Sequence, residues 1–383
     1  MRYDVPTLTD GAAEDPAGDR VTLRAHREED VPGVHQQCTD PLTQDWTTVP
    51  VPYTRDDAKR FVREVMPGGW QTDRECGFAV DVGGRYAGTV LLRNEGEGRG
   101  EIAYASHPWV RGRGVLERAL RLLLTWGFDE RGLQMVIWWA NRGNWPSRKL
   151  AWRLGFTMEG TVRSWLPQRG QLYDAWVGTL LAADERKPRH RWLDVPVIDS
   201  PRLPIRLRAP RESDVPRVLE GCRDEQTAHW LGGIPQPYTE ELAARFVTTR
   251  LEGMAAGTDL HLVVADRVDD RLLGVLTVGD IDPLHESAEI GYWTHPAERG
   301  RGVTTEAVRL AARHALLPVD VGGLGLVRVL AHAALGNLAS RAVLTGAGLA
   351  EAGLERMSTR TRNGLQDAVR HELLADDLTD VRT

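Results

Sequence analysis

The chain has 383 residues, of which 42% are hydrophobic and 27% charged, and its formal net charge is −6. This composition is ordinary for globular proteins, so we expect two or three packed domains and not a disordered chain. Binding to nucleic acid depends on a basic surface that neutralises phosphates, so the net acidity argues against a nucleic-acid partner. No apolar run reaches the length of a membrane helix, which argues against a membrane partner.

Three cysteines, Cys38, Cys76 and Cys222, form no CxxC pair and are too few for a disulfide framework. The N-terminal segment is acidic and lacks the apolar core of a signal peptide. Both features predict a cytoplasmic protein.

The first half of the chain predicts alternating strands and helices. Apolar residues recur at helical spacing over 115–128, and this pattern closes at Gly132. Gly83 and Gly84 separate two alternating runs and predict a hairpin. The expected strands are 21–24, 76–82, 85–93, 101–105 and 135–140, with two more near 160–163 and 174–180. Four helices are expected: one after residue 34, one around 56–65, one over 115–128 and one that ends at Gly155. This order predicts an α+β fold with a mostly antiparallel central sheet and helices on both faces.

The second half repeats the first. VTLRAHREEDVPGVHQQC, from Val21, matches IRLRAPRESDVPRVLEGC, from Ile205, and EIAYASHPWVRGRGV, from Glu101, matches EIGYWTHPAERGRGV, from Glu289. A third block, GNWPSRKLAWRLGF, matches GNLASRAVLTGAGL. The order of the blocks never changes, and their spacing grows in small steps, as loop insertions such as the Gly-rich PVDVGGLG would produce. We therefore predict a duplicated domain.

The domain boundary is expected where the chain becomes charged and rich in proline. We predict a flexible N-terminal tail at 1–19, an N-terminal domain at 20–184, a linker at 185–202 and a C-terminal domain at 203–377.

A loop rich in glycine and arginine connects a strand to a helix in each half. Its glycines let the backbone turn tightly and approach a ligand, and its N–H groups and the helix dipole converge on one point. The arginines add positive charge, so the loop suits a pyrophosphate, although it is neither a Walker loop nor GxGxxG. One such loop alone is more often a solvated helix start, but its recurrence in the same context favours binding. These glycines and arginines are Arg111, Gly112, Arg113, Gly114, Arg299, Gly300, Arg301 and Gly302.

The run EIGYWTHPAERGRGVTTEAVRLAARHAL, followed by GNLASRAVL, resembles the GNAT superfamily, and most closely the branch that contains the ribosomal-protein N-terminal acetyltransferases. The resemblance implies two tandem GNAT-like domains that use acetyl-CoA, or another acyl-CoA, as co-substrate and no metal. The family motif R/Q-x-x-G-x-G/A falls on Arg299, Gly302 and Thr304 in the second half. In the first half it falls on Arg111, Gly114 and Leu116, and both halves depart from the small sixth residue.

The second loop keeps more of the expected phosphate site, because Thr305 offers a hydroxyl where the first half has Glu117. The residues that we expect to hold the coenzyme are Val110, Arg111, Gly112, Arg113, Gly114, Val115 and Asn144 in the first half, and Glu298, Arg299, Gly300, Arg301, Gly302, Val303, Thr305 and Asn337 in the second.

An NxxS motif recurs as Asn144/Ser147 and Asn337/Ser340. By the resemblance, each Asn hydrogen-bonds the pantetheine region of the coenzyme and each Ser lies near the thioester sulfur. Asn and Ser are also ordinary helix N-cap residues, so a purely structural role stays open.

The resemblance implies direct attack of an amine on the thioester in a ternary complex. We expect Glu101 and Glu289 to act as bases, and Ser147 and Ser340 to serve the leaving thiolate. Backbone N–H groups around Trp109 and Val110, and around Ala297 and Glu298, are the expected donors to the thioester oxygen. Each Glu has an alternative role, as a carboxylate paired with an arginine. The histidines of the two HP pairs, His107 and His295, are expected to be structural.

Tryptophan is concentrated in the first half, where ten of the 13 precede residue 180. Large side chains in the core are the simpler interpretation. The alternative is an aromatic pocket for an apolar or aromatic acceptor or for a long acyl chain, with the two halves diverged in role.

The sequence therefore predicts an acyltransferase that acts on a primary amine of a small molecule or peptide. The alternatives are a non-catalytic acyl-CoA sensor or scaffold, or one active and one degenerate domain. The repeat is compatible with a monomer that forms an internal pseudo-dimer, or with a homodimer.

Overall fold

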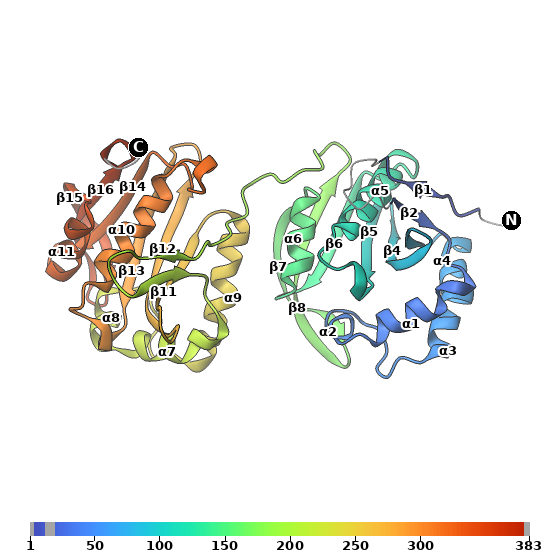
Figure 1. Cartoon of the computed structure of the whole chain (residues 1–383), viewed down its shortest axis with the longest axis horizontal. Coiled ribbons are helices and arrows are strands. Elements are labelled where there is room, and N and C mark those ends of the chain that lie inside the picture. Colours follow the sequence, from blue (N-terminus) through green and yellow to red (C-terminus); the bar gives the residue numbers. More distant parts are fainter. Residues whose placement is uncertain (1–3, 12–19, 379–383) are drawn as a thin grey trace. The chain divides into compact units, whose positions relative to one another are not determined.

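The computed structural model describes residues 4–11 and 20–378 of the chain. The chain folds into two compact units that divide between Arg189 and His190. Each unit is a layered α+β structure built on a mostly antiparallel sheet, as predicted (Figure 1). Within the described residues, no helix is both long enough and apolar enough to cross a bilayer.

The elements of the N-terminal unit follow the predicted order. They are β1 (Leu8–Thr9), β2 (Val21–Arg24), η1 (Glu28–Asp30), α1 (Val31–Thr39), α2 (Pro41–Trp46), α3 (Arg55–Arg60), the π-helical η2 (Phe61–Val65), α4 (Met66–Gln71), β3 (Glu75–Val82), β4 (Arg85–Gly96), β5 (Arg99–Ser106), η3 (Pro108–Val110), α5 (Val115–Asp129), β6 (Met135–Asn141), α6 (Trp145–Arg153), β7 (Thr157–Gln168) and β8 (Gln171–Leu181).

The C-terminal unit repeats this order with one continuous helix, α9, in place of α3, η2 and α4. Its elements are β9 (Ile198–Asp199), β10 (Ile205–Arg208), η4 (Glu212–Asp214), α7 (Val215–Arg223), α8 (Glu225–Trp230), α9 (Glu240–Ala256), β11 (Leu260–Asp266), β12 (Leu272–Asp282), β13 (Ser287–Thr294), η5 (Pro296–Glu298), α10 (Val303–Leu316), η6 (Val319–Val321), β14 (Arg328–Ala334), α11 (Leu338–Ala347), β15 (Ala350–Thr361), β16 (Gly364–Leu374) and η7 (Ala375–Asp377).

The two sheets have the same topology. The strand order is β1-β2-β3-β4-β5-β6-β8-β7 in the first unit and β9-β10-β11-β12-β13-β14-β16-β15 in the second. The β5–β6 and β13–β14 pairs are parallel, because α5 and α10 carry the chain back over the sheet between them. In the first unit α5 and α6 cover one face of the sheet, while α1, α3 and η2 pack on the β3–β4 part of the other face. Trp70 of α4 instead joins the core on the α5 side.

The core of each unit lies between its central helix and the sheet. Helix α5 packs through leucines at helical spacing, Leu120, Leu123 and Leu124, none of which is exposed. At the positions of Leu123 and Leu124, helix α10 has the smaller residues Ala311 and Ala312, which are also fully buried. The same fold is thus filled by large side chains in one half and by closely packed small ones in the other.

The segments expected as a flexible tail and a linker both contain residues that pack against the folded units. Leu8 and Thr9, inside the segment expected as a tail, pair with Leu23 and Thr22. Leu193, inside the expected linker, is buried in the core of the C-terminal unit. Both segments therefore contribute to the units that they flank.

Candidate active site

The Gly/Arg loop forms the same cradle in both units. Gly112 and Gly114 have φ of 74° and 72°, and Gly300 and Gly302 have φ of 74° and 73°. This left-handed backbone favours glycine, and a Cβ built at any of the four would meet no atom within 4 Å. The space next to the backbone is therefore open at all four glycines.

The cradle ends at a helix N-terminus. The first turn of α5 begins with the bond from Arg118 N–H to the carbonyl of Gly114, and that of α10 with the bond from Glu306 N–H to Gly302. The N–H groups just before these donors, at 115–117 and 303–305, thus face out of the helix ends. Open space and outward N–H groups fit the pyrophosphate of a coenzyme A.

The first arginine of each loop anchors a neighbouring helix. Arg111 donates to Asp40 Oδ2 at 2.5 Å and to the Thr43 hydroxyl at 3.0 Å, and this pairing holds the pKa of Asp40 below its usual value. Arg299 contacts Asp224 and Thr227 in the same way. The arginine side chains thus fix the loop against the caps of α2 and α8, which leaves the backbone to meet a ligand.

Asp40 and Asp224 were not singled out in the sequence, although they stand two residues after the matched cysteines Cys38 and Cys222. The repeat places the two aspartates at equivalent positions, and this match is the sequence signal that could have identified them.

The other charged groups of the loops are also paired. Glu298 is 4% exposed and contacts Arg301 at 2.5 Å and Arg217 at 3.1 Å. Glu117, whose charge is unfavourable near phosphate, is paired with Arg121 at 2.9 Å. Neither carboxylate faces the cradle without a compensating cation.

The parallel ladder between the strands flanking the loop is short. Strands β5 and β6 pair from Arg99 to Ile102, and β13 and β14 pair from Ser287 to Glu289. Beyond these points the two strands of each pair no longer pair with each other, although each still pairs with its other neighbour. We call this unpaired stretch between the two strands the gap. Glu289 is the last paired residue of its strand, and Glu101 stands one residue before the last.

On the α6 or α11 side of this gap, a tyrosine meets the predicted serine. Tyr104 and Ser147 lie 2.8 Å apart, as do Tyr292 and Ser340. Burial raises the pKa of both phenols to about 12, so they are protonated at neutral pH. In the first unit Trp138 Nε1 also donates to the Ser147 hydroxyl, at 3.2 Å.

These tyrosines were missed in the sequence, although EIAYA and EIGYW place them at equivalent positions. They bring a second hydroxyl to each serine.

The asparagines of the NxxS motif cap their helices. Asn144 Oδ1 accepts the Ser147 N–H at 3.2 Å, and Asn337 Oδ1 accepts the Ser340 N–H at 3.1 Å. The cap places the serine at the first helical turn beside the gap.

The two glutamates lie on the opposite face of the sheet from the tyrosines, because successive strand residues alternate. Glu101 contacts Arg93 Nη1 at 2.5 Å, and its side chain is 21% exposed. Burial raises the pKa of Glu101, while Arg93 opposes that shift.

Glu289 has a different partner. His332 Nδ1 lies 3.0 Å from Glu289, and His332 Nε2 lies 3.2 Å from Glu355. The hydrogen bond to Glu289 raises the pKa of His332. Arg370 in turn contacts Glu355 at 3.2 Å, so Glu289 belongs to a charged network.

The expected oxyanion donors are engaged within the loop. Val110 N–H donates to the His107 carbonyl at 3.1 Å, and Glu298 N–H donates to the His295 carbonyl at 2.9 Å. Trp109 N–H and Ala297 N–H donate to Nδ1 of His107 and of His295, at 3.4 and 3.3 Å. Because all four N–H groups are engaged within the loop, this part of the prediction is wrong. His107 and His295 cap these turns, which is the structural role expected for them.

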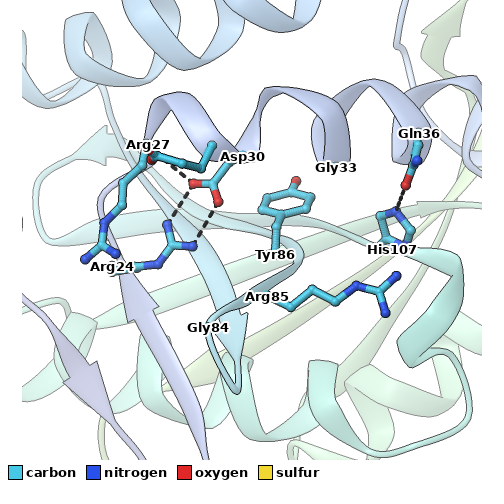
Figure 2. Close-up of a pocket in the computed structure, with 10 residues that line it drawn as sticks. Arg24, Arg27, Asp30, Gly33, Gln36, Gly84, Arg85, Tyr86 and His107 are labelled. Carbon is cyan, nitrogen blue, oxygen red and sulfur yellow. Dashed lines mark hydrogen bonds and ion pairs between the residues drawn. The ribbon is translucent and has the colours of Figure 1, made fainter.

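A cavity of about 400 Å³ lies under α1 in the N-terminal unit, and Figure 2 shows Arg24 paired with Asp30 at its edge. Gly33 and Tyr86 line it, and the Tyr86 ring occupies the place of a Cβ at residue 33. Arg217 of α7 stands at the position equivalent to Gly33 and donates to the Leu272 carbonyl at 2.5 Å. The two halves therefore differ in how this space is filled.

Comparisons with known proteins identify the family of this chain. A family model described as an acetyltransferase (GNAT) domain matches residues 20–157 and again residues 205–350. A Bacillus subtilis protein named "Probable N-acetyltransferase YjcK" is 31% identical over 139 residues, which cover 36% of this chain and 72% of that protein. Another from the same organism, "Putative ribosomal N-acetyltransferase YdaF", is 27% identical over 173 residues, 45% of this chain and 91% of its own. The solved structure "Mycobacterium smegmatis RimJ in complex with CoA-disulfide" has 22% identity and a TM-score of 0.41, covering 46% of this chain and 84% of that one.

Proposed function

The chain belongs to the GNAT acetyltransferase family, and from this premise we propose that each half transfers an acetyl group from acetyl-CoA to a primary amine. The observation that carries the proposal is the duplicated cradle, with its left-handed glycines and open space at the N-termini of α5 and α10. A side chain at these glycines would strain the left-handed backbone and would project into the space that the proposal gives to the pyrophosphate.

In this proposal the coenzyme is held mainly by backbone. The N–H groups of Gly112, Gly114 and Val115 in the first loop, and of Gly300, Gly302 and Val303 in the second, surround the pyrophosphate. The Thr305 hydroxyl adds a donor in the second half. The side chains of Arg113 and Arg301 contribute positive charge, and Asn144 and Asn337 keep their amide N–H groups for the pantetheine arm.

The bound acyl-CoA supplies a thioester as the acyl donor. The acceptor arrives as an ammonium and needs a base, for which Glu101 and Glu289 are placed on one face of the gap. The tyrosine–serine pair lies on the other face, where the Ser147 or Ser340 hydroxyl donates to the leaving thiolate and is re-protonated through Tyr104 or Tyr292.

The acetyl transfer conserves bonds and protons. A C–N bond forms as the C–S bond breaks, and the nitrogen loses two protons, one to become a free amine and one as the amide forms. One proton ends on the thiol and the other is released to water. Direct attack requires the amine and the thioester to be bound together, and the proposal places both at the gap.

The acceptor is a small-molecule or peptide amine. The name of YdaF includes the word ribosomal, which supports a protein or peptide amine among the candidates. An acceptor that enters from the glutamate face meets different side chains in the two halves. The two halves can therefore prefer different acceptors.

Release of free thiol from acetyl-CoA with a panel of primary amines tests the proposal. The test variant carries Gly114→Glu and Gly302→Glu, each of which puts a carboxylate in a cradle. The matched control carries Gly132→Glu and Gly322→Glu, which also have left-handed φ and open space but lie outside the loops. We expect turnover by the wild type and the control and none by the test variant; absence of wild-type turnover, with acetyl-CoA bound, would favour a coenzyme-binding scaffold.

A further inference from the structure

The two halves differ systematically on one sheet surface, which we call the outer face: the face of β6, β8 and β7, and of β14, β16 and β15, that points away from the central helix. Neighbouring residues such as Trp138 and Trp176 point into the core, so the alternate residues form the outer face. On it the first unit carries Ile137, Trp139, Val162, Trp165 and Val177, where the second carries Leu330, His332, Glu355, Ser358 and Arg370.

The charged residues on the outer face of the second unit pair with one another. His332 joins Glu289 to Glu355, and Arg370 neutralises Glu355. An apolar group placed on this surface would strip water from these ion pairs without replacing it, which is costly. The outer face of the second unit therefore disfavours an aromatic ligand.

The first unit has an aromatic platform there instead. The rings of Trp139 and Trp165 are stacked, with centroids 5.3 Å apart and planes 26° apart. Trp165 is 53% exposed, so the stack is open to solvent at one side. Core tryptophans such as Trp138 and Trp176 are 1% exposed, and the simpler interpretation of the sequence holds for them but not for this pair.

The platform adjoins the proposed base. Glu101 lies beside Ile137 in the parallel ladder, and Trp139 follows two residues later on the same face, about 7 Å along the strand. In the second unit the residue at the position of Trp139 is His332, whose ring reaches Glu289 at 3.0 Å. A group held against Trp139 is thus within side-chain reach of Glu101.

We propose that Trp139 and Trp165 determine the acceptor specificity of the N-terminal site, and that this site takes a primary amine borne next to an aromatic ring. The inference rests on the proposed function. The ring extends the Trp139–Trp165 stack, which directs the amine towards Glu101 at the gap. The C-terminal site, with His332 and Glu355 in these places, does not share this preference.

Two sources share this chemistry: a small arylalkylamine, and a peptide whose N-terminal residue is aromatic. The experiment has one arm for each. The first compares 2-phenylethylamine with butylamine, and the second compares the peptides Phe-Ser-Ala and Ser-Ser-Ala. The inference requires the aromatic preference in at least one arm, and the arm that shows it identifies the source.

The measurements use the full chain carrying Gly302→Glu, so that only the N-terminal half loads acetyl-CoA. Into it we introduce Trp139→His, the residue of the other half, or Trp165→Ser, an exposed change with little effect on folding. The matched control is Trp152→Thr, which likewise replaces a tryptophan by its counterpart but lies on α6, on the other side of the sheet. We expect Trp139→His to raise KM for the aromatic acceptor about tenfold and Trp165→Ser to raise it about threefold. The KM for the acceptor without a ring should stay within about twofold for all three variants.

Calorimetric binding of 2-phenylethylamine and of Phe-Ser-Ala to the CoA-loaded protein separates the possible failures. If amines are acetylated but neither KM nor binding of the aromatic acceptors depends on Trp139 or Trp165, this inference is overturned and the proposed function stands. If no amine is acetylated although an aromatic amine binds in a Trp139-dependent way, the proposed function fails and the aromatic site remains. Equal losses for acceptors with and without a ring would also contradict the inference.

Discussion

The two halves of this chain agree most closely in the loop that leads into α5 and α10, and differ most on the outer face. At the loop, four glycines share one backbone conformation and the arginines Arg111 and Arg299 make the same contacts. On the outer face, Trp139 and Trp165 replace His332 and Ser358. In the proposed function, a coenzyme common to both halves constrains the loop, whereas the acceptor side is free to diverge after duplication.

The largest effect should come from the part of the scaffold that the halves share. Arg24 is paired with Asp30, and Arg208 with Asp214, both pairs buried. Removing either carboxylate leaves a buried cation without its main partner, so Asp30→Ala and Asp214→Ala should each cost about 3–5 kcal/mol of unfolding free energy in their own half. Hydrogen exchange of each half, measured during chemical denaturation, gives the unfolding free energy of that half. A loss below about 1 kcal/mol for one of them would show that the halves do not share this support.

The second-largest effect should come from the tyrosine–serine pairs, whose loss should lower kcat by different factors in the two halves. Tyr292→Phe leaves Ser340 without its hydroxyl partner, and we expect kcat of the C-terminal half to fall about tenfold. Tyr104→Phe should cost less, about threefold, because Trp138 still donates to Ser147. Single-turnover rates in chains carrying Gly114→Glu or Gly302→Glu isolate each half. A larger loss for Tyr104→Phe than for Tyr292→Phe would contradict the assigned roles.

The pH dependence of the N-terminal half should be distinctive. Burial raises the pKa of Glu101, and only the ionised carboxylate accepts a proton, so activity should rise with pH through this raised pKa. Arg93 opposes the shift, so Arg93→Met should move the acid limb to still higher pH. The profile of kcat/KM against pH in the Gly302→Glu chain tests both, and a limb that moves down or stays in place after Arg93→Met excludes Glu101 as the base.

The smallest effect concerns the stability of the C-terminal half. The hydrogen bond to Glu289 raises the pKa of His332 in the folded state, so its contribution is fully present below the unfolded pKa of about 6.5 and is lost as pH rises through the folded pKa. His332→Gln should therefore destabilise this half at pH 5–6, by less than about 1 kcal/mol, and have no effect at alkaline pH. Trp139→Gln in the other half provides the comparison, because any loss there should not depend on pH.

Much of this organisation could be predicted from residues that recur at matched positions. The duplication, the α+β class and the glycine loops followed from blocks such as EIGYWTHPAERGRGV, because backbone conformation is tied to local sequence. Partners distant in sequence could not be predicted in this way: Arg111 meets Asp40, and His332 meets both Glu289 and Glu355, only through the fold. The oxyanion donors were predicted wrongly because the 3-10 turn that engages Val110 and Glu298 N–H has no clear sequence signature.

The central claim is that each half holds one coenzyme in its glycine loop, and calorimetric titration with acetyl-CoA tests it most directly. The wild-type chain should bind two molecules, and Gly114→Glu and Gly302→Glu should each remove one, while Gly132→Glu and Gly322→Glu remove none. A wild-type chain that binds none, or loop variants that both keep two sites, would contradict the account.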